Sequence, residues 1–252
     1  MGTLTKPLSL KDQVSFQCRL CGDCCRGLEG QLMLEPPDAY RLGRHLRASG
    51  AVAEIEDVYA KYAHVSMLAE GIPIFLMNTV GADHACVFLK ERRCTIYRAR
   101  PRVCRLYPFS AFPGGSGEKF RYAQCVDSNA AHFSAGTVCV QDWMWRNFSN
   151  EDRAFLEKEA GYTAELGRLL RGASSEKRRE WLFPLLFYRY YNYDLERPFP
   201  EQYERNHREL LDHLRQNRRN ERCLGCMYGN TVPPVRQAAG AIAGRPPPSA
   251  GK

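Results

Sequence analysis

The sequence predicts an α+β protein: a small, irregular cysteine-cluster module with short helices and strands, a mainly helical carboxy-terminal part and a disordered tail. Three observations lead to this fold class. Nine of the eleven cysteines lie between Cys18 and Cys139, where apolar runs are short, and long helical periodicity appears only after about residue 149. The last two dozen residues lack both periodicity and bulky apolar side chains. We therefore expect the module over residues 1–140, the helical part over 141–226 and the tail over 227–252.

The expected elements of the module are short and separated by turn residues. Pro36-Pro37-Asp38 opens a helical pattern that Ser49-Gly50 closes, because proline is favoured in a first turn and glycine after a last one. Pro101 starts a further helical turn that presents Cys104. The other expected elements are a loop at 17–30, a helix across 52–69, short strands at 72–80 and 85–89, and a flexible turn at 113–117 between extended segments.

Three helices are expected in the second part. Ser149 can cap a helix that runs from residue 150, with Asp152 in its first turn. A second helix over 175–192 is bent or broken at Pro184, which lacks a backbone donor, and a third runs from about 201 to 222. The apolar stripes of these helices are interpreted as core packing, and Trp143 and Trp145 as a join between the two parts.

Composition excludes several classes of protein. The chain has 252 residues with 44% hydrophobic and 25% charged residues, which is typical of a globular protein. The longest apolar run, Trp181–Tyr188, is far shorter than the roughly 20 residues of a membrane helix, and no signal peptide is recognisable, so we expect a cytoplasmic protein. The net charge of +8 is spread along the chain, which disfavours nucleic acid as a partner and leaves a protein or redox partner open.

The cysteines carry the chemistry. Disulfides are rare in the cytoplasm, so a clustered set of cysteines indicates metal ligation or thiol reactivity. CxxC spacing lets a tight turn direct two thiolates at one ion, and Gly22 suits such a turn. Adjacent Cys24 and Cys25 are expected to point apart and to serve different sites. The predicted metal ligands are Cys18, Cys21, Cys24, Cys25, Cys86, Cys94, Cys104 and Cys125, and less strongly Cys223 and Cys226.

The residues leave the metal open. Eight thiols could hold two four-thiolate sites, and tetrahedral thiolate coordination suits both iron–sulfur clusters and zinc. The CxxCxxC spacing matches the start of a bacterial ferredoxin motif, which favours an iron–sulfur cluster over zinc, with unmetallated thiols as a third hypothesis. Cys139 is interpreted as a small buried apolar residue, and His84 as a surface or hydrogen-bonded residue rather than a ligand.

Arginines surround the cysteines in the sequence. Each four-thiolate site would carry a net charge of about −2, so the arginines are interpreted first as counter-charge to the site. The alternatives to counter-charge are that the arginines bind an anionic substrate or partner, or that they bind a nucleic-acid backbone. Arg102 and Arg105 flank Cys104 and are expected to donate hydrogen bonds that tune a cluster. The full set is Arg19, Arg26, Arg92, Arg93, Arg98, Arg100, Arg102 and Arg105.

Two long motifs resemble a known family. The pattern FxCxxCGxCC is matched by Phe16–Cys25, and CxIYxxRPxxCRxYP by Cys94–Pro108. The chain thereby resembles the YkgJ-type cysteine-cluster family, also called the CxxCxxCC or zinc- or iron-chelating domain, over about residues 14–130. The resemblance implies a metal-chelating module, and some relatives are called flagellin lysine N-methylases.

Two classes of function follow from these observations. The first is a metal-binding protein with one or two Cys-ligated centres, in which iron–sulfur is favoured over zinc. Such a centre would serve electron transfer or a structural purpose. A purely structural zinc-binding interaction module is an alternative within this class. The second is a metal-dependent protein-modifying enzyme, like some relatives, with a polar pocket beside the metal centre. The sequence does not decide whether the protein is an enzyme.

Overall fold

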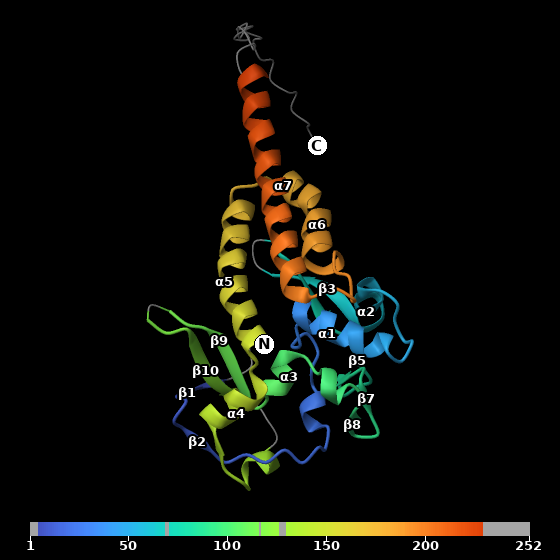
Figure 1. The fold of residues 1–252 in the computed structure, drawn as a ribbon, viewed down its shortest axis with the longest axis vertical. Helices are drawn as coiled ribbons and strands as arrows, with labels where there is room; N and C mark the ends of the chain where they lie inside the picture. The colour runs from blue at the N-terminus through green and yellow to red at the C-terminus, as the bar shows by residue number, and fades with distance from the viewer. Residues whose placement is uncertain (1–4, 69–70, 116, 126–129, 229–252) are drawn as a thin grey trace, which may run out of the picture. The chain divides into compact units, whose positions relative to one another are not determined.

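The computed structural model describes residues 5–68, 71–115, 117–125 and 130–228, and its fold is the α+β class that the sequence predicts (Figure 1). The chain divides into two compact units, Met1–Leu214 and Arg215–Lys252. The first unit contains all the sheets and most of the helices. The tail predicted for 227–252 lies outside the described residues from 229 onward.

The helices are short in the first half of the chain and long in the second. The α-helices are α1 (Pro36–Arg47), α2 (Ile55–Tyr62), α3 (Arg102–Leu106), α4 (Val140–Asn147), α5 (Asn150–Arg171), α6 (Ser175–Leu186) and α7 (Phe199–Tyr228). Three 3-10 turns and one π-helical turn complete the set: η1 (Asp23–Cys25), η3 (Tyr97–Ala99), η4 (Ala130–Phe133) and the π-helical η5 (Phe187–Tyr191).

Eleven strands form five small antiparallel sheets in the described residues. The largest sheet has the order β1-β10-β9, and the other four are two-stranded: β2 with β11, β3 with β4, β5 with β6 and β7 with β8. The strands are β1 (Thr5–Leu8), β2 (Gln13–Val14), β3 (Ala63–Met67), β4 (Pro73–Met77), β5 (Thr79–Val80), β6 (Ala85–Cys86), β7 (Leu89–Lys90), β8 (Arg93–Cys94), β9 (Phe109–Pro113), β10 (Phe120–Cys125) and β11 (Val138–Cys139).

Local sequence signals explain several of these boundaries. The Ser149 side chain accepts a hydrogen bond from the Asp152 backbone amide and the Asp152 carboxylate accepts one from the Ser149 amide, so α5 begins at Asn150 as the capping pattern predicts. The predicted helical turn after Pro101 is confirmed as α3. The α6 helix, which contains Pro184, ends at Leu186 and gives way to the π-helical turn η5, which confirms the predicted break.

The prediction of one helix across 52–69 is wrong in its second half. Helix α2 ends at Tyr62, and the chain continues as strand β3, which pairs with β4 from Ala63 opposite Met77 to Met67 opposite Pro73. The buried, apolar β4 needs a partner for its backbone groups, and this tertiary pairing overrides the local helical pattern of the segment. The two predicted strands at 72–80 and 85–89 are likewise divided into β4, β5, β6 and β7.

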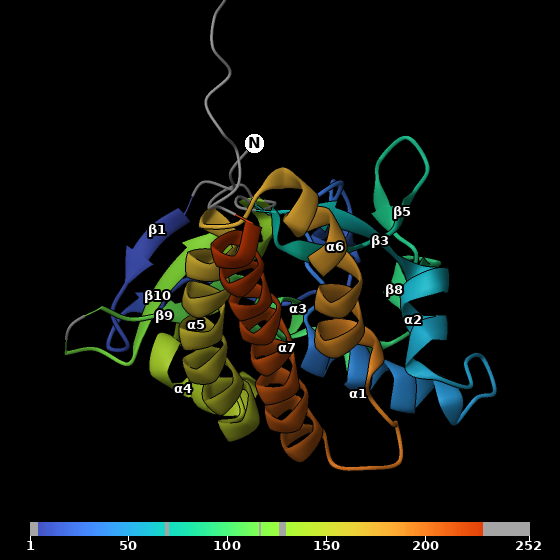
Figure 2. The ribbon, with the colours of Figure 1, turned by 90° about the horizontal axis from the view of Figure 1, so that it is seen from above.

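Two apolar clusters form the core. The larger cluster contains residues from both sides of residue 140, among them Leu42, Val58, Leu106, Met144 and Tyr203. The smaller cluster joins α5, α6 and the first part of α7, which lie side by side in Figure 2. Trp143 contributes to the join that the sequence predicts: its ring lies edge-on to Phe16, and its indole nitrogen donates to the Leu106 carbonyl oxygen at 2.9 Å. The same expectation is wrong for Trp145, which is 82% exposed. Within the described residues, no helix is both long and apolar enough to cross a membrane.

Candidate metal centre

Five cysteine thiols from four elements come together in the first unit. Each of these thiols shifts the pKa of at least one other member of the set, which indicates that the five share one neighbourhood of the fold. We call this set the five-thiol group. Its members are Cys24 and Cys25 in η1, Cys86 in β6, Cys94 in β8 and Cys104 in α3.

Burial and mutual repulsion act on the titration of this group. Burial raises the pKa of Cys86, Cys94 and Cys104, and neighbouring thiolates raise each of these pKa values further. The effect is largest at Cys104, whose pKa lies well above the ordinary value. Crowded thiols of this kind are costly to ionise together unless a cation shares their charge.

Cys24 and Cys25 do not point apart, contrary to the sequence-based expectation. A hydrogen bond between the two thiols lowers the pKa of Cys24 to about 7 and raises the pKa of Cys25. Both residues lie in the single 3-10 turn η1. They therefore contribute to the same group rather than to two different sites.

The left-handed backbone at Gly22 places η1 against the following hairpin. Gly22 has φ 78°, and a Cβ atom built on it would lie 2.7 Å from Leu89 Cδ1 and 2.8 Å from the Arg92 carbonyl oxygen. Only glycine fits such a close approach to another backbone segment. This contact brings Cys24 and Cys25 next to the β7–β8 hairpin that carries Cys94.

The Gly22→Ala variant is expected to bind less metal and to be less stable than the wild type. The added methyl group clashes with the Arg92 backbone and must displace η1 from the hairpin. Gly27→Ala is the matched control, because Gly27 has a similar φ of 64° but no atom within 4 Å of a built Cβ. Metal content and melting temperature are measured for both variants. Gly27→Ala shows the effect of left-handed backbone strain alone, and any further loss in Gly22→Ala is due to the clash. Equal losses in both would show that the close contact is unimportant.

One of the surrounding arginines acts on the thiols. The positive charge of Arg100 lowers the pKa of Cys24 and Cys94, as the counter-charge interpretation requires. Its guanidinium carbon lies 3.7 Å from the centre of the Tyr97 ring, and its Nε donates to the Tyr97 carbonyl oxygen at 2.9 Å. The side chain is therefore held beside the group by a cation–π contact and a hydrogen bond.

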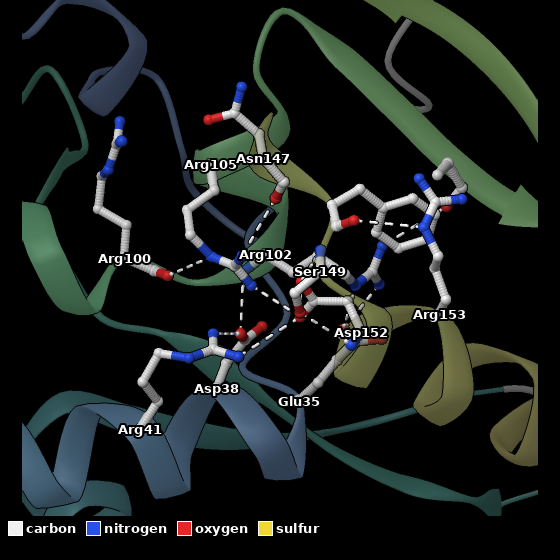
Figure 3. A network of polar contacts seen from close by, with 12 residues as sticks. Glu35, Asp38, Arg41, Arg100, Arg102, Arg105, Asn147, Ser149, Asp152 and Arg153 are labelled. Atoms are coloured by element: carbon white, nitrogen blue, oxygen red, sulfur yellow. Dashed lines mark hydrogen bonds and ion pairs between the residues drawn. The ribbon is translucent and has the colours of Figure 1, made fainter. Parts of the chain in front are cut away.

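Arg102 and Arg105 do not tune the thiols by hydrogen bonds, so that expectation is wrong. Arg102 Nη2 donates to Glu35 at 2.7 Å, and Arg105 Nη2 donates to Asp152 at 2.7 Å (Figure 3). Both arginines flank Cys104 in α3, but their guanidinium groups form ion pairs with the buried carboxylates of Glu35 and Asp152. Their role is to fix α3, and with it Cys104, against α1 and α5.

A second set of ligand atoms lies at Cys21, Asp23 and His132. Their ligand atoms all fall within 4.8 Å of one another, and the Cys21 sulfur lies 3.0 Å from His132 Nε2. Among the described residues this is the only set of three histidine, cysteine or acidic ligand atoms that are mutually so close. Neither Asp23 nor His132 is predicted as a ligand from the sequence. His132 lies over a hundred residues from Cys21 and belongs to no local motif.

The remaining predicted ligands are in less defined surroundings. Cys18 is exposed, and Cys125 is half-buried at the end of β10, where it pairs with Thr5 of β1. The side chains of Cys223 and Cys226 lie outside the described residues. For these four residues, metal ligation stays a prediction. His84 Nε2 lies 3.3 Å from Oε2 of Glu29 at the surface, in agreement with its interpretation as a surface or hydrogen-bonded residue.

Comparison with known proteins agrees with the motif and with this geometry. Residues 17–134 match the family model CxxCxxCC, which is described as a putative zinc- or iron-chelating domain. The matched range contains both the five-thiol group and the set at Cys21, Asp23 and His132. No solved structure matches the chain. Residues 17–134 of this chain are thus similar to the CxxCxxCC zinc- or iron-chelating domain.

Proposed function

We propose that the five-thiol group binds one iron–sulfur cluster, with Cys24, Cys86, Cys94 and Cys104 as its ligands. The observation that carries this proposal is the convergence of thiols from three separate stretches of chain on one another. Thiolate is the ligand that iron–sulfur clusters require, and such a cluster supplies one-electron transfer or a structural cross-link when bound. Arg100 lies where it offsets part of the negative charge of the ligands.

The spacing of the thiols favours a cluster over a single zinc ion. Zinc bonds to sulfur at about 2.3 Å in a tetrahedron, which places the sulfurs about 3.8 Å apart. In the described part of the chain, no three sulfurs of the five-thiol group lie mutually within 4.8 Å. A polynuclear cluster spans a wider set of thiols than one ion does. The adjacent Cys25 then remains as a thiol beside the cluster.

The cavities favour a binding or electron-transfer role over catalysis at the thiols. The larger of the two described cavities, about 870 Å³, is lined by residues of α1, α5 and α7, including Tyr40, Arg44 and Phe155. No cysteine lines this cavity. An enzyme that used the metal centre would need a substrate site beside it, so the structure supports the first class of function.

The proposal predicts that the purified protein contains iron and acid-labile sulfide and loses both when Cys104 is replaced by alanine. Cys104→Ala removes the half-buried thiol whose pKa burial raises well above the ordinary value. Cys139→Ser is the matched control, because the sulfur of Cys139 contacts the Leu10 carbonyl oxygen at 3.7 Å and belongs to neither set. Elemental analysis and sulfide assay after anaerobic purification measure the result, and circular dichroism verifies that the helices are intact.

The Cys94→Ser variant tests the same site from a different element, the short strand β8. It too is expected to lose most of the iron and sulfide. A wild-type protein that contains zinc without sulfide would overturn the iron–sulfur proposal. Full retention of iron in folded Cys104→Ala and Cys94→Ser would show that the five-thiol group is not the site.

A further inference from the structure

Three different kinds of ligand atom converge at the end of η4. His132 is buried, with only 4% of its surface exposed, and its Nε2 lies 3.0 Å from the sulfur of Cys21 and 4.0 Å from Oδ2 of Asp23. One imidazole nitrogen, one cysteine sulfur and one carboxylate oxygen are a donor set that the ordinary packing of a core does not require. The set therefore needs a chemical explanation.

The directions of the contacts distinguish a metal site from a nucleophilic triad. In a Cys–His–Asp triad the carboxylate contacts one ring nitrogen and the nucleophile contacts the other. Here both the thiol of Cys21 and the carboxylate of Asp23 are on the Nε2 side of the His132 ring. The opposite nitrogen, Nδ1, has no hydrogen-bond partner among the described residues. Convergence on one nitrogen is the arrangement that ligands around a shared ion adopt.

The distances fit a single ion after small movements. Zinc binds sulfur at about 2.3 Å and nitrogen or carboxylate oxygen at about 2.0–2.2 Å, so tetrahedral angles place sulfur and nitrogen about 3.6 Å apart and nitrogen and oxygen about 3.4 Å apart. The observed separations of 3.0 Å and 4.0 Å lie on either side of these values. Side-chain movements of roughly 0.6 Å would complete the geometry.

The surrounding fold holds the histidine in place. The backbone amide of Gln17 donates to the His132 carbonyl oxygen at 2.9 Å, which ties η4 to the start of the cysteine motif. Phe16 and Tyr107 pack edge-on against the imidazole ring, with ring centres 6.2 Å and 6.5 Å from it. Aromatic walls and a backbone link fix His132 where a loop residue would otherwise be free to turn away.

We propose that Cys21, Asp23 and His132 bind one zinc ion at a site separate from the five-thiol group. Zinc is the ion for which thiolate, imidazole and carboxylate are all ordinary ligands. Three protein ligands leave the fourth position open, and the half-exposed Cys21 and Asp23 leave that position in contact with solvent. The site takes water there and gives the domain a Lewis-acidic ion, independent of the proposed cluster.

Zinc titration against a chromophoric competitor, on protein that retains its iron, tests the site. His132→Ala and Cys21→Ser are each expected to weaken zinc binding by more than about 10–100-fold, the loss seen when even an outer-shell partner is removed. Two matched controls should bind zinc as the wild type does. His84→Ala removes an exposed histidine that contacts Glu29, and Cys139→Ser removes a cysteine that belongs to neither set.

X-ray absorption at the zinc edge gives a second, independent result. One sulfur and three nitrogen or oxygen neighbours are expected. Two or more sulfurs, or a loss of zinc in Cys18→Ser, would overturn the proposed ligand set. Loss of iron together with zinc in folded His132→Ala would show that the two sites are not separate. Unchanged zinc affinity in both His132→Ala and Cys21→Ser would refute the site whatever the iron content.

Discussion

Replacement of Arg102 by methionine is expected to lower the free energy of unfolding by about 3–5 kcal/mol. The side chains of Arg102 and Glu35 are each only 8% exposed, and they are joined by a hydrogen-bonded ion pair of 2.7 Å. Removal of the arginine leaves a buried carboxylate without its cation. The neighbouring carboxylate of Asp38 is less affected, because Arg41 still donates to it at 2.9 Å.

The pH dependence of this loss follows from the titration of Glu35. Burial raises the pKa of Glu35 to about 7, and the charge of Arg102 opposes this rise. Without Arg102 the pKa of Glu35 rises further. At low pH the Glu35 carboxyl group is then protonated, and no unpaired charge is buried. A group with a raised folded-state pKa contributes stability at low pH that is lost as the pH rises through that pKa. The deficit of Arg102→Met should therefore be smaller at about pH 5 than at about pH 8.

Denaturant unfolding of Arg102→Met and of a double variant, each compared with the wild type, measures this effect. The double variant Glu35→Met/Arg102→Met should recover most of the lost stability, because an apolar pair can replace a buried ion pair at little cost. Arg102→Met alone should also bind less iron, since Arg102 belongs to α3, which carries Cys104. A change below about 1 kcal/mol in Arg102→Met would show that the pair behaves like an exposed one.

The sequence predicts the elements whose signals are local. The Ser149 cap, Pro101, Pro184 and the glycine-rich turn at 113–117 each act within a few residues, and the structure contains the corresponding boundaries. Strand β3 has no such signal. Its extended form depends on pairing with β4, and a pairing between segments is not visible in the pattern of either segment alone.

For the candidate site, too, local signals are visible in the sequence and tertiary contacts are not. The spacing of the cysteine motifs identifies the members of the five-thiol group, but it does not show how Cys24 and Cys25 are oriented within one 3-10 turn. It also does not identify His132, which is brought to Cys21 by the tertiary link between its carbonyl oxygen and Gln17. The arginines beside Cys104 illustrate the opposite error. Their sequence neighbours are cysteines, but their spatial partners are carboxylates of other elements.

Removal of metal under reducing conditions is expected to unfold the cysteine loops while the helices of the second part persist. In zinc-finger peptides, metal binding contributes about 10–16 kcal/mol to folding, and an iron–sulfur centre that cross-links several segments should act similarly. The segments that carry the thiols have little regular structure to replace it. Their long-range backbone bonds include Gly27 to Asp83 at 2.8 Å and Leu28 to His84 at 3.1 Å.

Hydrogen exchange followed by mass spectrometry distinguishes this local unfolding from the alternatives. Protection at residues 22–28 and 84–95 should be lost with the metal, whereas α5 should keep its protection through its cap and its buried Leu166 and Leu170. Unchanged protection in the loops would contradict a structural role of the metal. Equal loss of protection in the loops and in α5 would show that the metal stabilises the whole fold and not the loops alone. Loss confined to the loops is the expected result, because the regular strands of these segments, β6, β7 and β8, are only two residues long each.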